Sequence, residues 1–169
     1  MTASRLFRGT IALAAFAFAG CLTILSAQAQ VAIETAAQAK IAESEPGAAN
    51  KVAIQVNQND KAVMDLALNN AKNVVDYYKS KGETVAVEIV TYGPGLHMLR
   101  SDTSPVKERI AVMSLESSNV KFIACGNTQA NQSKAENKAV VLISEATVTP
   151  SGVVRLMELQ KQGYAYIKP

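Results

Sequence analysis

The chain has 169 residues, of which 49% are hydrophobic and 18% charged, and its formal net charge at pH 7 is +3. This length has room for one folded domain. The lysines and arginines are scattered among acidic residues, whereas binding to nucleic acid needs clustered positive charge, so we expect no nucleic-acid partner.

The first 29 residues have the composition of a secretory signal peptide. Arg5 and Arg8 precede an apolar run over residues 11–25, and an Ala-x-Ala cleavage site ends at Ala29. We expect cleavage after Ala29 and a mature protein that is periplasmic or secreted. The apolar run is shorter than the roughly 20 residues that span a bilayer, and no stable membrane insertion is expected after cleavage. Losing two arginines and no acidic residue takes the net charge from +3 to +1.

The two cysteines lie in different parts of the chain, Cys21 in the predicted leader and Cys125 in the predicted domain. Cys21 ends a Phe-Ala-Gly-Cys sequence typical of lipoprotein processing, and a lipoprotein is therefore the alternative, although the apolar run continues past this cysteine. Once the leader is removed, Cys125 is the only cysteine left. It cannot form an internal disulfide, and its thiol must be buried, reactive or paired with another molecule.

Residues 30–50 are rich in Ala, Gln, Glu and Ser and contain no aromatic side chain. This composition, with Pro46 and Gly47 near its end, predicts a flexible linker that includes a nascent helix over residues 34–44. We therefore expect the folded domain to occupy residues 51–169.

Strands and helices alternate along this domain. Apolar, β-branched runs bounded by turn residues predict five strands, over residues 51–56, 84–90, 121–124, 146–149 and 164–167. Apolar residues at three- and four-residue spacing predict a helix over residues 61–80, ended by Gly82. Ser104 and Pro105 have the pattern of a cap and a first-turn proline. The remaining helical segments are predicted over residues 96–99, 104–117, 126–133, 135–144 and 151–162.

This alternation predicts an α/β fold, a three-layer α/β/α sandwich around a five-stranded, mostly parallel sheet with right-handed crossovers. Ligands of such sheets bind beyond the carboxyl ends of the strands. The turns after the first three strands should meet at that edge. They supply the candidate site residues, which are Asn57, Asp60, Tyr92, Gly93, Gly95, His97, Cys125, Gly126, Asn127 and Thr128.

Cys125 stands out among these candidates. It ends a strand directly before a helix, where backbone N–H groups and the helix dipole favour a thiolate. A cysteine that only packs as a small apolar side chain fits the same position. Tyr92 begins a Tyr-Gly-Pro-Gly turn that lacks the spacing and the lysine of a P-loop. His97, the single histidine, is too isolated for a metal site, so that no metal or cofactor is expected.

Four short blocks resemble exported members of the DsrE family. They are Asn-Asn-Ala-Lys-Asn at 69–73, Tyr-Gly-Pro-Gly at 92–95, Phe-Ile-Ala-Cys-Gly-Asn-Thr at 122–128 and Gly-Tyr-Ala-Tyr-Ile at 163–167. The resemblance extends over nearly all of residues 51–169. It implies a DsrE-like sandwich, assembly into trimers or hexamers, and a cysteine, matched here by Cys125, that carries sulfur as a persulfide.

Two functions are therefore considered. The first is a sulfurtransferase-like persulfide carrier or thiol redox protein that exchanges sulfur with a thiol or sulfur-donor partner through Cys125. In this interpretation residues 126–128 supply N–H donors, while Tyr92 and His97 tune or shield the thiol. The alternative is a non-catalytic oligomeric module that binds a small anion or metabolite near Tyr92, Gly95 and Asn127.

Overall fold

The computed structural model describes residues 48–169. The predicted signal peptide, the lipoprotein alternative at Cys21 and nearly all of the predicted linker lie outside the described residues. Five parallel strands form one sheet in the order β4-β3-β2-β1-β5. The strands are β1 (Asn50–Val56), β2 (Val85–Thr91), β3 (Val120–Cys125), β4 (Ala146–Thr149) and β5 (Ala165–Ile167).

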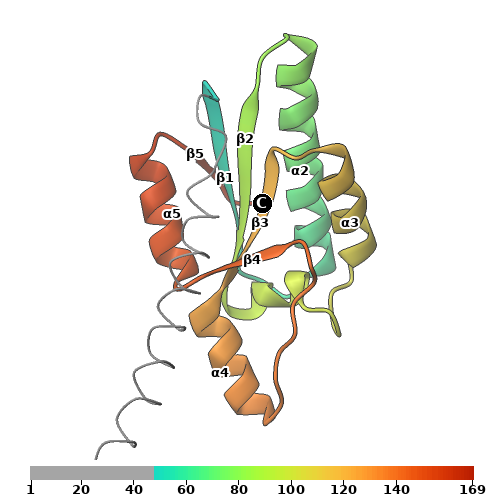
Figure 1. Cartoon of the computed structure of the whole chain (residues 1–169), viewed down its shortest axis with the longest axis vertical. Coiled ribbons are helices and arrows are strands. Elements are labelled where there is room, and N and C mark those ends of the chain that lie inside the picture. The colour runs from blue at the N-terminus through green and yellow to red at the C-terminus, as the bar shows by residue number, and fades with distance from the viewer. Residues whose placement is uncertain (1–47) are drawn as a thin grey trace, which may run out of the picture. The chain divides into compact units, whose positions relative to one another are not determined.

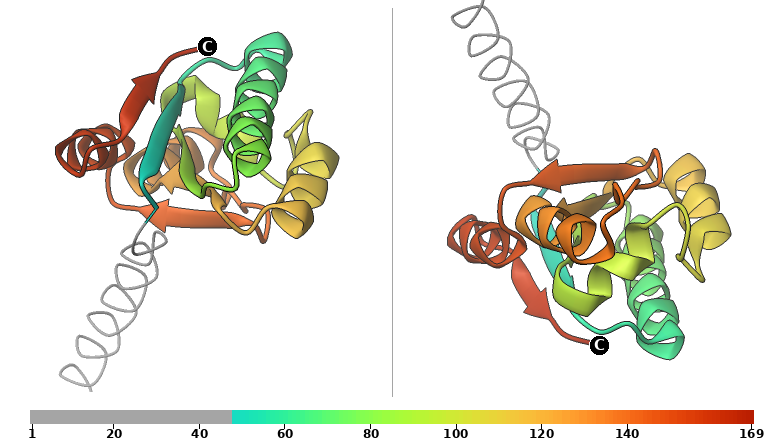
Figure 2. Two further views of the ribbon diagram at one scale, coloured as in Figure 1. Left: turned by 90° about the horizontal axis from the view of Figure 1, so that it is seen from above. Right: turned by 90° about the horizontal axis from the view of Figure 1, so that it is seen from below.

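Helices cover both faces of this sheet, which confirms the predicted α/β sandwich (Figures 1 and 2). The helices are α2 (Lys61–Ser80), the 3-10 helix η1 (Gly93–Leu99), α3 (Lys107–Glu116), α4 (Gly126–Glu136) and α5 (Gly152–Lys161). In Figure 2, α2 and α3 lie on one side of the sheet and α5 lies on the other. In Figure 1, α4 continues directly from β3 beyond the carboxyl edge of the sheet, where η1 also lies.

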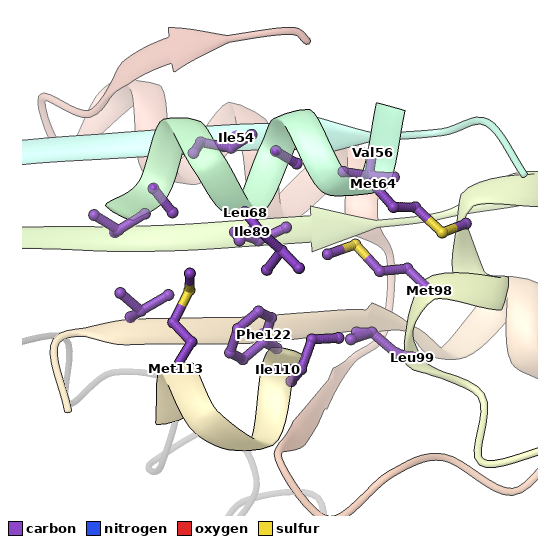
Figure 3. Packing of buried hydrophobic residues seen from close by; sticks show 14 of the residues in the cluster. Ile54, Val56, Met64, Leu68, Ile89, Met98, Leu99, Ile110, Met113 and Phe122 are labelled. Atoms are coloured by element: carbon purple, nitrogen blue, oxygen red, sulfur yellow. The ribbon is translucent and has the colours of Figure 1, made fainter. Parts of the chain in front are cut away.

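The larger core lies between the sheet and the pair α2 and α3 (Figure 3). Alternate residues of the central strands point into it, among them Ile54, Ile89 and Phe122. Met64 and Leu68 of α2 meet them at helical spacing, as the apolar period of this helix requires. Helix α2 has the predicted bounds, residues 61–80. At its start, the Asp60 side chain accepts a hydrogen bond from the Ala62 N–H at 2.7 Å.

The second core lies under α5 and is smaller and more polar. Ala53, Ala86 and Ile123 of the sheet contact Leu156 and Leu159 of the helix. A buried ion pair lies in the same layer, with the Nε of Arg155 in α5 donating to Glu88 of β2 at 2.9 Å. The face of the sheet that leads to Cys125 is therefore partly polar.

Two predicted helices differ from the structure. The helix predicted over residues 104–117 begins at Lys107, because the Ser104 hydroxyl donates to the Met98 carbonyl at 2.5 Å and holds a turn before the helix. The helix predicted over residues 135–144 is wrong. Asn137, with a left-handed φ of 49°, ends α4, and the chain then runs extended, with Leu142 bridged to Arg100. The apolar run of that segment covers the loop that follows η1.

No helix within residues 48–169 combines the length and the apolar character needed to cross a bilayer.

Candidate functional site

Three helices begin at the carboxyl edge of the sheet beside Cys125. This residue is the last of β3 and directly precedes α4. In the ladder between β3 and β4 it lies opposite Thr149, which is followed by the start of α5. The third helix, η1, follows β2. The positive ends of two helix dipoles, those of α4 and α5, therefore lie at this edge, and they favour an anion.

The environment of the Cys125 thiol favours its charged form. Only 5% of the residue is exposed, and burial alone raises the pKa of a thiol. Hydrogen bonding from the Thr128 hydroxyl and from the N–H groups of Gly152, Thr128 and Asn127 outweighs burial, and the pKa of Cys125 lies below its ordinary value. The sequence predicts N–H donors at residues 126–128, and Asn127 and Thr128 are the two of these residues that lower the pKa of the thiol.

Thr128 connects the thiol to η1. Its Oγ1 atom accepts a hydrogen bond from the Gly93 N–H at 3.0 Å, which leaves the hydroxyl hydrogen for the sulfur of Cys125. Gly93 adopts a left-handed backbone with a φ of 53°, a conformation that glycine reaches without strain. Its place in the turn therefore determines the direction of the Thr128 hydroxyl.

Gly152, the first residue of α5, was not among the predicted site residues. A Cβ atom at this position would lie 3.3 Å from Cys125 Cβ and 3.1 Å from Tyr92 Cβ, so the absence of a side chain allows the helix start to approach the thiol. Ser151 caps this helix. The Ser-Gly pair at the start of the last predicted helix was the available indication, since a fourth strand would bring that helix to the same edge of the sheet.

Tyr92 flanks the thiol and belongs to a chain of polar side chains. Its hydroxyl accepts a hydrogen bond from the side-chain amide of Gln55, whose carbonyl oxygen accepts one from the Tyr166 hydroxyl. Burial, followed by the nearby Tyr166, raises the pKa of Tyr92. Tyr92 therefore remains neutral near neutral pH and borders the site without charge.

Gly126 and Asn127 contact the segment that joins β4 to α5. A Cβ on Gly126 would come within 3.2 Å of the Thr149 carbonyl oxygen, and the Asn127 N–H donates to the Pro150 carbonyl at 3.1 Å. The side chain of Asn127 is exposed. These two residues therefore hold α4 against the segment that leads into α5.

Gly95 and Asn57, also predicted as site residues, meet at the end of β1 instead. A Cβ on Gly95 would lie 2.2 Å from the Val56 carbonyl oxygen and 2.8 Å from Asn57 Cα, so only glycine allows η1 to pack there. Gly95 is buried in this contact. Its place in the structure is that of a packing residue rather than of a pocket lining.

His97 lies among a different set of polar groups. Its Nδ1 atom is 2.8 Å from the Thr103 hydroxyl, and His97 is among the residues that lower the pKa of Glu136 at the far end of α4. The structure thus brings Tyr92, Gly93 and residues 126–128 together at Cys125 and places His97 in this other cluster. Within residues 48–169, no group of three or more His, Cys, Asp and Glu side chains is arranged to hold a metal ion.

Comparison with known proteins gives a family and a related structure. The model of the DsrE/DsrF-like family matches residues 50–169. The solved structure of a protein of unknown function, MTH1491 from Methanobacterium thermoautotrophicum, is similar with a TM-score of 0.58 and 29% sequence identity, covering 71% of this chain and 99% of that chain. No curated protein matches the chain.

Proposed function

The chain belongs to the DsrE/DsrF-like family, and from this premise we propose that it is a sulfur carrier that holds one sulfane sulfur atom on Cys125 as a persulfide. The observation that carries the proposal is the set of donors around the thiol. Thr128, Asn127 and Gly152 stabilise negative charge on the sulfur, and the thiolate is the nucleophilic form of cysteine. The same donors would stabilise the anionic outer sulfur of a persulfide.

The uptake step is a thiol exchange. The Cys125 thiolate attacks the terminal sulfur of a hydrogen disulfide anion, the S–S bond of that donor breaks, and hydrosulfide leaves with its electron pair. A new S–S bond joins the sulfur to Cys125, and the persulfide carries the negative charge. No external oxidant is consumed, because the transferred atom is already at the sulfane oxidation level.

Burial of the thiol supports a small donor. With 5% of Cys125 exposed, an inorganic polysulfide reaches the sulfur more readily than a persulfide on a folded protein. Export through the predicted leader and assembly into homo-oligomers, trimers or hexamers, are further parts of the proposal. The exposed apolar side chains of α5, which are Val153, Val154 and Met157, support such an assembly.

The test is to treat the native protein with inorganic polysulfide and to analyse the Cys125-containing peptide by mass spectrometry. We expect the mass of one added sulfur atom, its release as thiocyanate by cyanide, and no addition in the Cys125→Ser variant. The same peptide in urea-unfolded protein serves as the positive control. Addition to the unfolded chain alone would contradict the proposal.

The same material also tests the binding-module alternative. A small anion that raises the thermal unfolding midpoint equally in wild type and in Cys125→Ser, without any sulfur transfer, would favour that alternative.

A further inference from the structure

Helix α4 supplies most of the donors at the thiol but has no apolar anchor of its own. None of its residues is buried, and its apolar side chains are two alanines, Ala130 and Ala135. Hydrophobic burial, which normally fixes a helix against a core, contributes little here. Three of the four hydrogen bonds that lower the pKa of Cys125 nevertheless come from its first turn. Polar contacts must therefore fix the orientation of α4.

Arg100 makes the strongest of these contacts. Its side chain is 2% exposed, and it follows η1 directly. Nη1 and Nη2 donate to the Glu136 carboxylate, with 2.8 Å for the Nη2 bond, and Nη1 also donates to Gln132 at 3.2 Å. Nε and Nη2 donate to the two carboxylate oxygens of Asp102, both at 2.9 Å. These bonds match the five N–H donors of a guanidinium group.

The charges around Arg100 are in balance. Glu136 and then Asp102 raise the pKa of Arg100, and Arg100 in turn lowers the pKa of both carboxyl groups. Lys138 lies 3.2 Å from Asp102 on the outer side of the cluster. A guanidinium group that is buried and fully hydrogen-bonded has a fixed geometry, which a mobile surface pair lacks.

Two amides of α4 reinforce the same orientation. The Gln132 side chain donates to the Gly93 carbonyl at 3.2 Å, and the Gln129 side chain donates to the Val140 carbonyl at 2.9 Å. Gly93 is also the residue whose N–H binds Thr128. The last turns of α4 and its first turn are thus tied to the same short segment.

We propose that Arg100 is a positioning residue for Cys125. By binding Glu136 and Gln132 it holds α4 against η1, and this places the hydroxyl and the N–H group of Thr128 at the sulfur. The inference rests on the proposed role of Cys125 as a thiolate. Arg100 itself contacts neither the sulfur nor a substrate in this assignment.

The test uses a variant that breaks the link and leaves Arg100 paired. Glu136→Ala combined with Gln132→Ala removes the contacts of Arg100 with α4, while its bidentate contact with Asp102 remains. The measurement is the rate of iodoacetamide addition to the Cys125-containing peptide as a function of pH, in the full chain. The midpoint of this profile reports the proton affinity of the thiol, whereas its plateau reports access.

We expect the midpoint to move to higher pH and the rate at pH 7 to fall about threefold, because the loss of thiolate is partly offset by the greater nucleophilicity of a more basic thiol. Glu136→Gln, which retains part of the hydrogen bonding, should give an intermediate midpoint. Arg109→Gln is the matched control. It removes an exposed arginine that joins α3 to Asp65 and Asn69 on α2, and the profile should remain that of the wild type.

A wild-type midpoint in the double variant, together with a lowered thermal unfolding midpoint, would overturn the inference and leave Arg100 a purely structural residue. Should the double variant fail to fold, the midpoint of Glu136→Gln decides the question in the same way. The outcome is separate from that of polysulfide loading. A shifted midpoint without polysulfide loading supports the positioning role of Arg100 and contradicts the carrier function. Polysulfide loading without a shifted midpoint supports the carrier function and contradicts the positioning role.

Discussion

Thr128 Oγ1 lies 3.0 Å from the Gly93 nitrogen, and this single contact joins the turn after β2 to the helix after β3 at the thiol. The hydroxyl accepts from Gly93 and donates to Cys125. A side chain with one donor and two acceptor positions is therefore used on both of its sides.

Replacing Thr128 by Val should weaken the thiolate. The variant keeps the shape of the side chain but removes the donor to Cys125 and the acceptor for Gly93, and a hydrogen bond to a charged group contributes about 1.5–3 kcal/mol. We expect the pH profile of Cys125 alkylation to move to higher pH, with a rate at pH 7 that is about threefold lower. Thr128→Ser retains both hydrogen bonds and should behave as wild type. An unchanged profile in Thr128→Val would show that the hydroxyl does not stabilise the thiolate.

Gly152→Ala should disturb the thiol through the start of α5. The new methyl group would lie 3.1 Å from Tyr92 Cβ and 3.3 Å from Cys125 Cβ, closer than ordinary contact, and the helix start must shift. We expect a loss of roughly 1 kcal/mol in unfolding free energy by urea titration, and slower alkylation of Cys125 at pH 7. Asp60→Ala removes the cap of α2 at a cost of about 1 kcal/mol and serves as the comparison of equal stability. If both variants slow alkylation equally, the effect is one of general stability.

The buried pair of Glu88 and Arg155 should show the asymmetry typical of buried charges. Glu88→Ala removes the buried carboxylate that Arg155 of α5 binds and leaves the exposed Glu158 at 3.8 Å, and we expect a loss of about 3 kcal/mol in unfolding free energy. Replacing both residues by Leu should recover most of this loss, because a packed apolar pair carries no desolvation cost. Lys61→Ala, which breaks an exposed pair with Asp65, is expected to cost less than about 1 kcal/mol. Equal losses for the single and the double replacement would contradict this view of the pair.

Acid should destabilise the fold through the cluster around Arg100. Arg100 lowers the pKa of Asp102 and of Glu136 in the folded chain. A carboxyl group with a lowered folded pKa stabilises the fold above its unfolded pKa, about 4, and this contribution is lost as the pH falls through the folded value. We expect the unfolding free energy from urea titrations to fall below pH 4, with a shallower fall in Asp102→Asn combined with Glu136→Gln. Asp76→Asn, which breaks an exposed pair with Lys72, is the control and should change the unfolding free energy at pH 7 by less than about 1 kcal/mol.

Much of the fold could be predicted because its local patterns agree with its tertiary structure. Helix α2 has its predicted bounds, residues 61–80, since an apolar period marks the element and Gly82 follows its end. Residues 135–144 were misassigned because Val140 and its apolar neighbours are too few to show a period. Their conformation depends on Arg100 and Leu99, whose backbones lie beside them.

The candidate site could be predicted where it depends on the ends of strands. Alternation of strands and helices brings Tyr92 and Cys125 to one edge whatever the side chains are, and the helix that begins after Cys125 was expected. The contributions of Gly152 and Arg100 could not be read from the sequence, because each depends on the distance between segments that the sequence does not specify. His97 was grouped with the thiol because it lies on the same edge, but its ring belongs to the cluster at the far end of α4.

The absence of a buried residue in α4 has a thermodynamic consequence. Exposure of apolar surface is the main source of the heat-capacity change of unfolding, and detachment of this helix would expose little of it. The enthalpy difference between docked and detached α4 therefore changes little with temperature. Its ties include a carboxylate, Glu136, that is 39% exposed and subject to screening. The share of Cys125 present as thiolate should then fall as the ionic strength of the surrounding compartment rises.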